Sequence, residues 1–348
     1  MARITLSIAL CVMLAACSGG AASILPEHAQ QVLSGTPASS STPAPVVETA
    51  PDTSAPEWLT RVNQFRTMAG LDPITANNKM SDDDTAHARY LVKNYSAGKS
   101  PSLEMHSESR GNQWYTAEGY AAARTSDIIP PGGIELTDRQ AIDLWIAGPF
   151  HRFPILNPKL TEAGFGSFDE DGVSAIAMQL RKPNALEDPN APSPTHRSMI
   201  REESSTDTET DTTNQRVVQF PPPNSTFPLA AFSSTELPNP LASCPGYVTP
   251  TGFPITLQLG GTASVKLDSA SVTSDGQPIE SCAFDSASYR ASDEAQTYTG
   301  RAVLTSFGAV VLIPKERLHS GKTYNVAIVA NGKPYNWTFA IGNHGQRQ

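Results

Sequence analysis

The chain has 348 residues, of which 39% are hydrophobic and only 17% are charged, and its formal net charge is −9. This length is sufficient for about two domains and at least one sizeable core. The acidic balance argues against non-specific nucleic-acid binding, because such binding needs a basic surface. The 29 prolines exceed the usual share of about 5%, which indicates that part of the chain is linker.

The first residues resemble the export signal of a bacterial lipoprotein. A basic start at Arg3 is followed by an apolar run, Ile4–Leu14, that is too short to span a bilayer. The run ends in Ala-Ala-Cys17-Ser18, which resembles a lipobox. This resemblance implies a signal peptide over residues 1–16 and attachment of lipid to Cys17. The alternative is an ordinary secretory signal in which Cys17 is incidental. Ser18 resembles an outer-membrane sorting signal, so we expect anchoring at the bacterial cell envelope, in the outer membrane or at the cell surface.

The next segments are expected to be a tether and then helices. Residues 17–54 are rich in Ala, Ser, Thr and Pro, which is typical of a disordered tether. Helical periodicity then predicts three helices. The first has capping-box spacing from Ser54 and ends at Gly70, and the second begins at Ser81 with aspartates in its first turn. The third has a T-x-x-Q box from Thr137 and ends at Gly148.

Two strand-like runs follow the helices. They span residues 164–168 and 173–180 and are joined by a turn at 169–172, which is a hairpin signal. The second run is apolar on both faces, which predicts a strand with layers above and below it. Helices followed by a doubly covered sheet predict an α/β/α sandwich over residues 55–182.

The rest of the chain is divided into a linker and a β-rich domain. Residues 183–215 are acidic and polar, which predicts a disordered linker. Residues 216–348 are interpreted as β structure only, with strands at 253–259, 302–305, 309–313, 324–329 and 335–341. Asn331-Gly332 is the strongest hairpin signal in the chain. Short strands at this spacing predict a β-sandwich.

Two cysteines remain once Cys11 is assigned to the signal peptide and Cys17 to the lipid. Cys244 and Cys282 both lie in the C-terminal domain of an exported chain. An oxidising compartment favours one disulfide between them, although two buried free thiols remain the alternative.

Candidate chemistry is concentrated in the helical domain. The G-x-S-x-G, H-E-x-x-H and phosphate-loop motifs are all missing from the sequence. His106 and Glu118 flank a loop rich in polar and aromatic residues, and His151 follows the third predicted helix. Two histidines and a carboxylate are suited to hold a divalent metal such as Zn²⁺, with His106 and His151 as ligands, or to activate a water molecule. The alternative is a buried polar network that fixes the loops. His87 is interpreted as a structural histidine.

Several ordered motifs resemble the bacterial branch of the CAP superfamily, which includes cysteine-rich secretory, antigen 5 and pathogenesis-related 1 proteins. The motifs are His87-Ala-Arg-Tyr, Met105-His106-Ser-Glu, Ala117-Glu118-Gly119, and Gly-Pro-Phe-His151-Arg with the later Gly-Phe-Gly166. The resemblance implies the same α/β/α sandwich. It also implies a cleft with two histidines and two acids.

The resemblance assigns three of these four cleft residues directly. His106 matches the first histidine, Glu118 the acid of a motif that usually reads G-E-N, and His151 the second histidine. The second acid has no clean counterpart. Asp143 is the nearest candidate, and Glu135 and Asp138 are weaker ones.

Aromatic residues near His106 leave two interpretations open. Trp114, Tyr115 and Tyr120 either line a pocket for an apolar or sugar-like ligand or pack in the core.

The C-terminal third resembles bacterial Ig-like modules in residues 310–318, 320–326 and 335–339. The chain is thus expected to be an α+β protein, with a CAP-type sandwich followed by an all-β Ig-like sandwich. We expect it to be anchored to a membrane through its lipid and to bind a lipid, a cell-wall component or a protein, but no nucleic acid. The alternatives are a metal-assisted or His/Glu-dependent hydrolase of peptide or glycan, and an adhesion module with a vestigial cleft.

Overall fold

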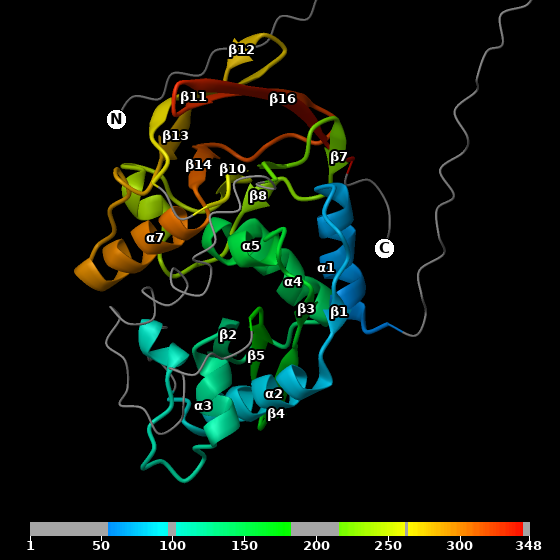
Figure 1. Cartoon of the computed structure of the whole chain (residues 1–348), viewed down its shortest axis with the longest axis vertical. Coiled ribbons are helices and arrows are strands. Elements are labelled where there is room, and N and C mark those ends of the chain that lie inside the picture. Colours follow the sequence, from blue (N-terminus) through cyan, green and yellow to red (C-terminus); the bar gives the residue numbers. More distant parts are fainter. Residues whose placement is uncertain (1–54, 97–101, 182–215, 262–263, 344–348) are drawn as a thin grey trace, which may run out of the picture. The chain divides into compact units, whose positions relative to one another are not determined.

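The computed structural model describes residues 55–96, 102–181, 216–261 and 264–343 (Figure 1). The predicted signal peptide, Cys17, the tether and the acidic linker lie outside these ranges. No helix in the described ranges is both long enough and apolar enough to cross a bilayer.

The first part of the described chain contains five α-helices around a small sheet. Its elements are α1 (Glu57–Met68), β1 (Thr75–Ala76), α2 (Asn78–Lys93), η1 (Leu103–His106), α3 (Ala117–Ala123), β2 (Ser126–Gly132), α4 (Asp138–Ala147), α5 (Pro149–Ile155), β3 (Glu162–Ala163), β4 (Gly166–Glu170) and β5 (Val173–Gln179). The sheet has the order β2-β5-β4 and is antiparallel, and β1 pairs with β3 in a separate parallel ladder.

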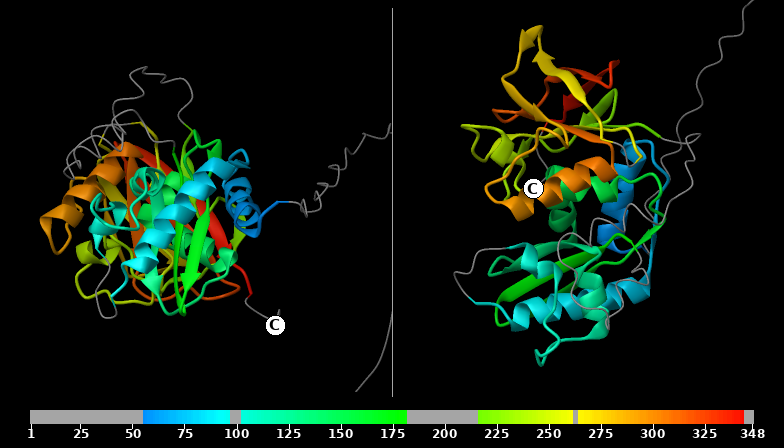
Figure 2. Two further views of the ribbon diagram at one scale, coloured as in Figure 1. Left: turned by 90° about the horizontal axis from the view of Figure 1, so that it is seen from below. Right: turned by 60° about the vertical axis from the view of Figure 1, so that its left-hand side comes forward.

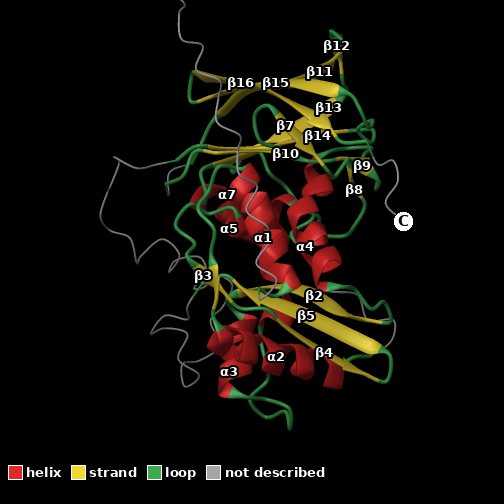
Figure 3. Cartoon of the chain, turned by 90° about the vertical axis from the view of Figure 1, so that its right-hand side faces the viewer, coloured by secondary structure: helices red, strands yellow, loops and turns green. Residues whose placement is uncertain are grey.

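The central strand β5 is covered on both faces, as the sequence predicts (Figure 3). Ala175 packs in a cluster with Ala88 and Leu91 of α2. Ile176 and Met178 belong to a second hydrophobic cluster, which also contains residues of α1 and α4. Mixed helices and sheets therefore form three layers in this part of the chain.

Two helix starts differ from those expected. The N-cap of α1 is Pro56, which makes no side-chain capping bond. Ser54, from which a capping box was expected, lies outside the described residues. Helix α2 starts a turn earlier than Ser81, because Asn77 caps it by accepting a hydrogen bond from the Met80 amide. The T-x-x-Q box at Thr137 is present in full at the start of α4.

Because α2 starts earlier than expected, Asp84 does not lie in its first turn. Its side chain is instead buried in the protein interior. Its carboxylate accepts hydrogen bonds from the Ser126 hydroxyl at 2.6 Å and the Gln179 amide at 2.9 Å. Burial raises the pKa of Asp84 to about 7, although these two bonds oppose the shift. Asp84 thus links α2 to both β2 and β5.

The second part of the described chain forms two larger sheets and a helix. Its elements are β6 (Val218–Phe220), β7 (Ser225–Phe227), β8 (Ala231–Phe232), η3 (Pro240–Ser243), β9 (Thr251–Gly252), β10 (Ile255–Gln258), β11 (Leu267–Ser274), β12 (Gln277–Pro278), β13 (Ser281–Phe284), α7 (Glu294–Ser306), β14 (Ala309–Pro314), β15 (Thr323–Ala330) and β16 (Lys333–Ile341). The sheets have the orders β13-β14-β10-β6 and β12-β11-β15-β16-β7, and β8 pairs separately with β9.

Helix α7 shows that the expectation of β structure alone was wrong (Figure 2, orange). The run 302–305, expected as a strand, lies inside this helix. Asp293 caps α7 by accepting from the Gln296 amide, and Gly300 lies against the ring of Tyr289. A short apolar run does not distinguish strand from helix by itself. The hairpin at Asn331-Gly332 is confirmed, since it joins β15 and β16 with both residues at positive φ.

The expected disulfide is present between Cys244 and Cys282, with their Cα atoms 5.7 Å apart. It ties the segment after η3 to β13. The closed loop spans 38 positions, so the bond restricts a long segment of the unfolded chain.

The two parts of the chain share their hydrophobic core. Phe65 of α1 lies 6.4 Å from Phe220 and 6.0 Å from Phe227, measured between ring centroids. Phe150 and Phe153 of α5 pack in one cluster with residues of β14, such as Val311. Helix α5 therefore covers strands of the second part as well as packing in the first.

Gly166 offers a direct test of how closely β4 approaches α2. A Cβ atom at this position would clash with the Thr85 amide nitrogen, because the two atoms would be closer than Cβ atoms are to their neighbours in real proteins. We expect Gly166→Ala to lower the unfolding free energy by about 1–3 kcal/mol, the usual cost of overpacking, in chemical denaturation. The matched control is Gly111→Ala, because a Cβ there meets nothing within 4 Å. Equal stability of the two variants would show that the strand and helix are not in this contact.

Candidate functional site

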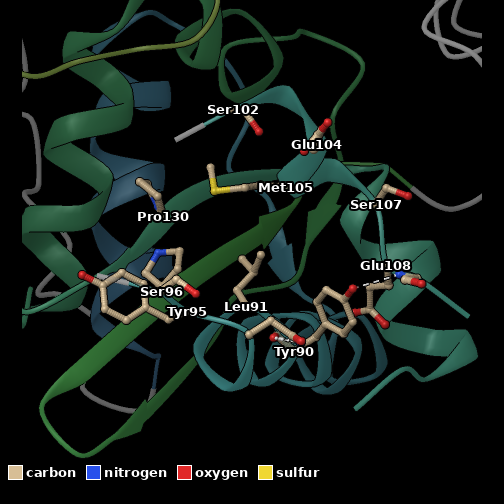
Figure 4. A pocket seen from close by; sticks show the side chains of 13 residues that line it. Tyr90, Leu91, Tyr95, Ser96, Ser102, Glu104, Met105, Ser107, Glu108 and Pro130 are labelled. Carbon is tan, nitrogen blue, oxygen red and sulfur yellow. Dashed lines mark hydrogen bonds between the residues drawn. The ribbon is translucent and has the colours of Figure 1, made fainter. Parts of the chain in front are cut away.

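A pocket of about 610 Å³ lies beside the C-terminal end of α2 (Figure 4). Its other walls are η1 with the residues that follow, and the end of β2. The lining residues are Tyr90, Leu91, Asn94, Tyr95, Ser96, Ser102, Glu104, Met105, Ser107, Glu108, Ser109, Pro130 and Pro131. This volume is within the range of sites for small molecules, about 300–1,000 Å³.

A buried histidine–carboxylate pair fixes the wall formed by η1. His87 of α2 is fully buried, and its Nδ1 lies 2.9 Å from Glu108 Oε1. Its Nε2 lies 2.9 Å from the carbonyl oxygen of Met105, so both ring nitrogens face acceptors. The second carboxylate oxygen of Glu108 accepts from the Thr116 amide at 3.2 Å. His87 therefore has a structural position, and Glu108 joins α2, η1 and the start of α3.

The close packing around Glu108 explains the glycine that follows Glu118. A Cβ on Gly119 would lie 2.5 Å from Glu108 Oε1, so a larger residue there would displace the carboxylate. Glu118 itself is exposed in the first turn of α3. The N-terminal end of α3 carries the positive end of the helix dipole, which attracts a negatively charged side chain at this position.

His106 is the last residue of η1 and is partly buried. Its Nδ1 lies 3.0 Å from the carbonyl oxygen of Ala123, at the end of α3. His106 is adjacent to the pocket-lining residues Met105 and Ser107 but is not itself among them.

His151 lies in the first turn of α5 and contacts a residue from the second part of the chain. Glu236 Oε1 accepts from the His151 amide at 2.7 Å and lies 2.9 Å from His151 Nδ1. The residue before α5, Gly148, has no side chain to cap the helix. A Cβ there would come within 2.6 Å of Glu236 Oε1. Glu236 thus caps α5 from a distant segment, and it reaches the helix because position 148 is glycine.

The charge around His151 strongly favours its protonated form. Burial alone would lower the pKa of His151, but the charge of Asp127 and the hydrogen bond and charge of Glu236 outweigh it and raise the pKa to about 9. The neighbouring Arg152 is fully buried, and burial lowers its pKa to about 9 although Glu236 opposes the shift. Arg152 donates to the carbonyl oxygens of Ile146 and Pro254, both at 2.8 Å.

Asp143, the nearest candidate for the second acid, is bound elsewhere. Its carboxylate pairs with Arg61 Nε at 2.6 Å, which joins α4 to α1. The guanidinium of Arg61 also lies over the ring of Phe65. In the part of the chain that the structure describes, no group of three or more His, Cys, Asp or Glu side chains is placed to hold a metal ion.

The aromatic residues near His106 do not line this pocket. Trp114 lies under the cationic groups of Arg89 and Lys93, at 4.8 and 4.7 Å from its ring. Tyr120 is buried to 1% exposure and lies 6.0 Å from Tyr115 between ring centroids.

Sequence reasoning missed the carboxylates that pair with His87 and His151. Glu108 stands directly after the His106-Ser107 pair, so its nearness to the candidate site was a usable signal. Glu236 lies 85 positions after His151 in a loop, and no motif marks it. The pocket was missed because most of its lining residues lie outside the recognised motifs; only Met105, Ser107 and Glu108 belong to one.

Comparison with known families is consistent with this architecture. Helices on both faces of a small antiparallel sheet define an α/β/α domain in the first part of the chain. Residues 59–177 match the family model described as CAP, the cysteine-rich secretory protein family, so this segment is a CAP domain. The match extends from α1 into β5. A search of curated proteins found no match to the chain.

The raised pKa of His151 predicts a pH-dependent stability. A histidine with an ordinary pKa of 6.5 when unfolded and about 9 when folded stabilises fully below pH 6.5, and this contribution is lost as the pH rises through 9. The shift corresponds to on the order of 3 kcal/mol. We expect the unfolding free energy to fall between pH 6.5 and 9, and to fall less in Glu236→Gln.

The control for this measurement is His319→Gln, which replaces a histidine in a loop of the second part. It should keep the pH slope of the parent chain in denaturant titrations. An identical slope in the parent and Glu236→Gln would contradict the assigned role of the Glu236 charge.

Proposed function

We propose that this chain is an exported, lipid-anchored CAP-domain protein that binds a ligand at the cell envelope. The observation that carries the proposal is the pocket of about 610 Å³ in the CAP domain. Its mixture of hydroxyl, amide and apolar side chains is typical of sites that bind a small molecule and orient it. The candidate ligands are a lipid, a cell-wall component or a segment of a protein.

The pocket is preorganised by contacts that do not need a ligand. His87 and Glu108 hold η1 on α2 through buried hydrogen bonds. The Tyr90 hydroxyl accepts from the Ser109 amide at 2.9 Å, which fixes the segment after η1 (Figure 4). Less conformational entropy is lost on binding when a site is already ordered.

The lipid anchor is proposed from the sequence alone. The lipobox-like residues before Cys17 support it, and the tether of residues 18–54 would give the CAP domain reach from the membrane. Replacing Cys17 with Ser should release the protein from the membrane fraction and remove the lipid mass from its N-terminus. Unchanged membrane attachment of this variant would contradict a lipid anchor at Cys17.

Hydrolysis receives less support than binding from the described geometry. His151 pairs with Glu236 and Asp143 pairs with Arg61, so each side chain joins two segments of the fold. The C-terminal part, whose Ig-like relationship is a proposal, would serve as a spacer or adhesion module.

A pocket-filling variant tests the binding function. Ser102 lines the pocket, and its side chain makes no described capping bond. The unlipidated Cys17→Ala chain would be incubated with a bacterial envelope lipid extract and with soluble peptidoglycan fragments, and bound mass would be read by native mass spectrometry. We expect an adduct with one of these probes, and we expect Ser102→Trp to abolish it.

The matched control is Ser320→Trp, at an exposed position outside the CAP domain. This variant should retain the adduct in full. An adduct that persists in Ser102→Trp, or no adduct with either probe, would overturn ligand binding in this pocket.

A further inference from the structure

The described lining of the pocket is electronegative, which restricts the ligands that it can take. It lies at the C-terminal end of α2, where the helix dipole places partial negative charge. Glu104 is in the described lining, and none of the described lining residues is Lys, Arg or His. The carboxylate of Glu108, also in the lining, is buried against His87. Within this described lining, an anionic group would therefore meet repulsion and no cationic partner.

The nearest basic side chains on α2 are held away from the pocket by other partners. Arg89 lies over the rings of Trp114 and Phe168. Lys93 lies over Trp114 and also pairs with Glu170. These contacts leave the lining with hydrogen-bonding groups that are mainly neutral.

The neutral groups provide both acceptors and donors. Four serines line the pocket, together with the Asn94 amide and the Tyr90 hydroxyl. Tyr90 Oη accepts from the Ser109 amide, and its own proton is available for a further acceptor. The Asn94 amide donates to the Tyr90 carbonyl, which holds its side chain in place at the end of α2.

Flat apolar surfaces complete the lining. Tyr95 is 36% exposed and lies with Leu91, Met105 and Pro130 around the pocket (Figure 4). A tyrosine ring and a proline ring present faces suited to the C–H face of a sugar ring, while serine and asparagine match its hydroxyl and acetamido groups. A phospholipid or fatty acid would fit the apolar surfaces but not the charge.

We infer that the pocket binds a neutral saccharide rich in hydroxyl and acetamido groups. This inference rests on the proposed binding function and specifies its ligand class. Tyr95 would pack against a sugar ring, and Tyr90, Asn94 and the serines would bond to its polar edge.

The test uses the unlipidated Cys17→Ala chain and two probes. The first is chitotriose, a neutral trimer of N-acetylglucosamine, in isothermal titration calorimetry, and the second is phosphatidylglycerol vesicles in a sedimentation assay. We expect saturable binding of chitotriose that salt barely changes, since a neutral ligand has no charge to screen. Tyr95→Ala should weaken it at least about tenfold, as for loss of an aromatic anchor, while Tyr95→Phe retains it.

Two controls separate the saccharide inference from the binding function. Ser320→Trp should bind chitotriose like the parent, and circular dichroism should show that Tyr95→Ala stays folded. Binding to phosphatidylglycerol vesicles that is lost in Ser102→Trp, without binding of chitotriose, would overturn the saccharide inference but retain the pocket as a binding site. Chitotriose binding that Tyr95→Ala and Ser102→Trp do not change would overturn the placement of the sugar. Absence of binding to both probes would overturn the saccharide inference, and the envelope-extract experiment then decides the binding function separately.

Discussion

The N-terminus of α5 is stabilised by a carboxylate that lies 85 positions away in the sequence. Gly148 provides no capping side chain, and its lack of a Cβ leaves space for Glu236. One oxygen of Glu236 contacts both the His151 amide and the His151 ring. The positive end of the helix dipole and the imidazolium of His151 both attract this carboxylate.

The other contacts between α5 and the second part of the chain depend on this position of the helix. With the helix start fixed, Arg152 reaches the Pro254 carbonyl and lies over the rings of Phe220 and Phe253. Phe150 also packs against the second part, 5.2 Å from Tyr289 between ring centroids. A buried arginine is costly unless its donors are bonded, so these contacts require the second part of the chain. The CAP domain therefore shares one of its own helices with the following sheets.

This arrangement places the two histidine–carboxylate pairs in different roles. His151 and Glu236 hold the junction, whereas His87 and Glu108 shape the pocket between α2 and η1. The pocket and the attachment of the second part thus depend on separate residues. The pocket lies at the C-terminal end of α2, and the cationic groups of Arg89 and Lys93 on that helix lie over the ring of Trp114.

Local signals predicted much of the fold, and contacts distant in sequence account for most of what was missed. The Thr137 box and the Asn331-Gly332 turn were read correctly, because each depends on neighbouring residues. The helix at 294–306 was missed because apolar runs of this length suit either a strand or a helix. Motifs selected His106, Glu118 and His151 as candidates, but none of the three is among the described lining residues of the pocket. Nothing local indicates that Asp143 pairs with Arg61 or that His151 pairs with Glu236.

The most direct test of the shared helix is native-state hydrogen exchange of the unlipidated chain, compared with its Glu236→Ala variant. If α5 joins the two parts, amides of α1 and α4 and amides of β10 and β14 should exchange through the same global opening. Glu236→Ala should then lower the opening free energy of both groups equally. Loss of protection in β10 and β14 with unchanged protection in α1 and α4 would contradict the account, because the two parts would then unfold independently.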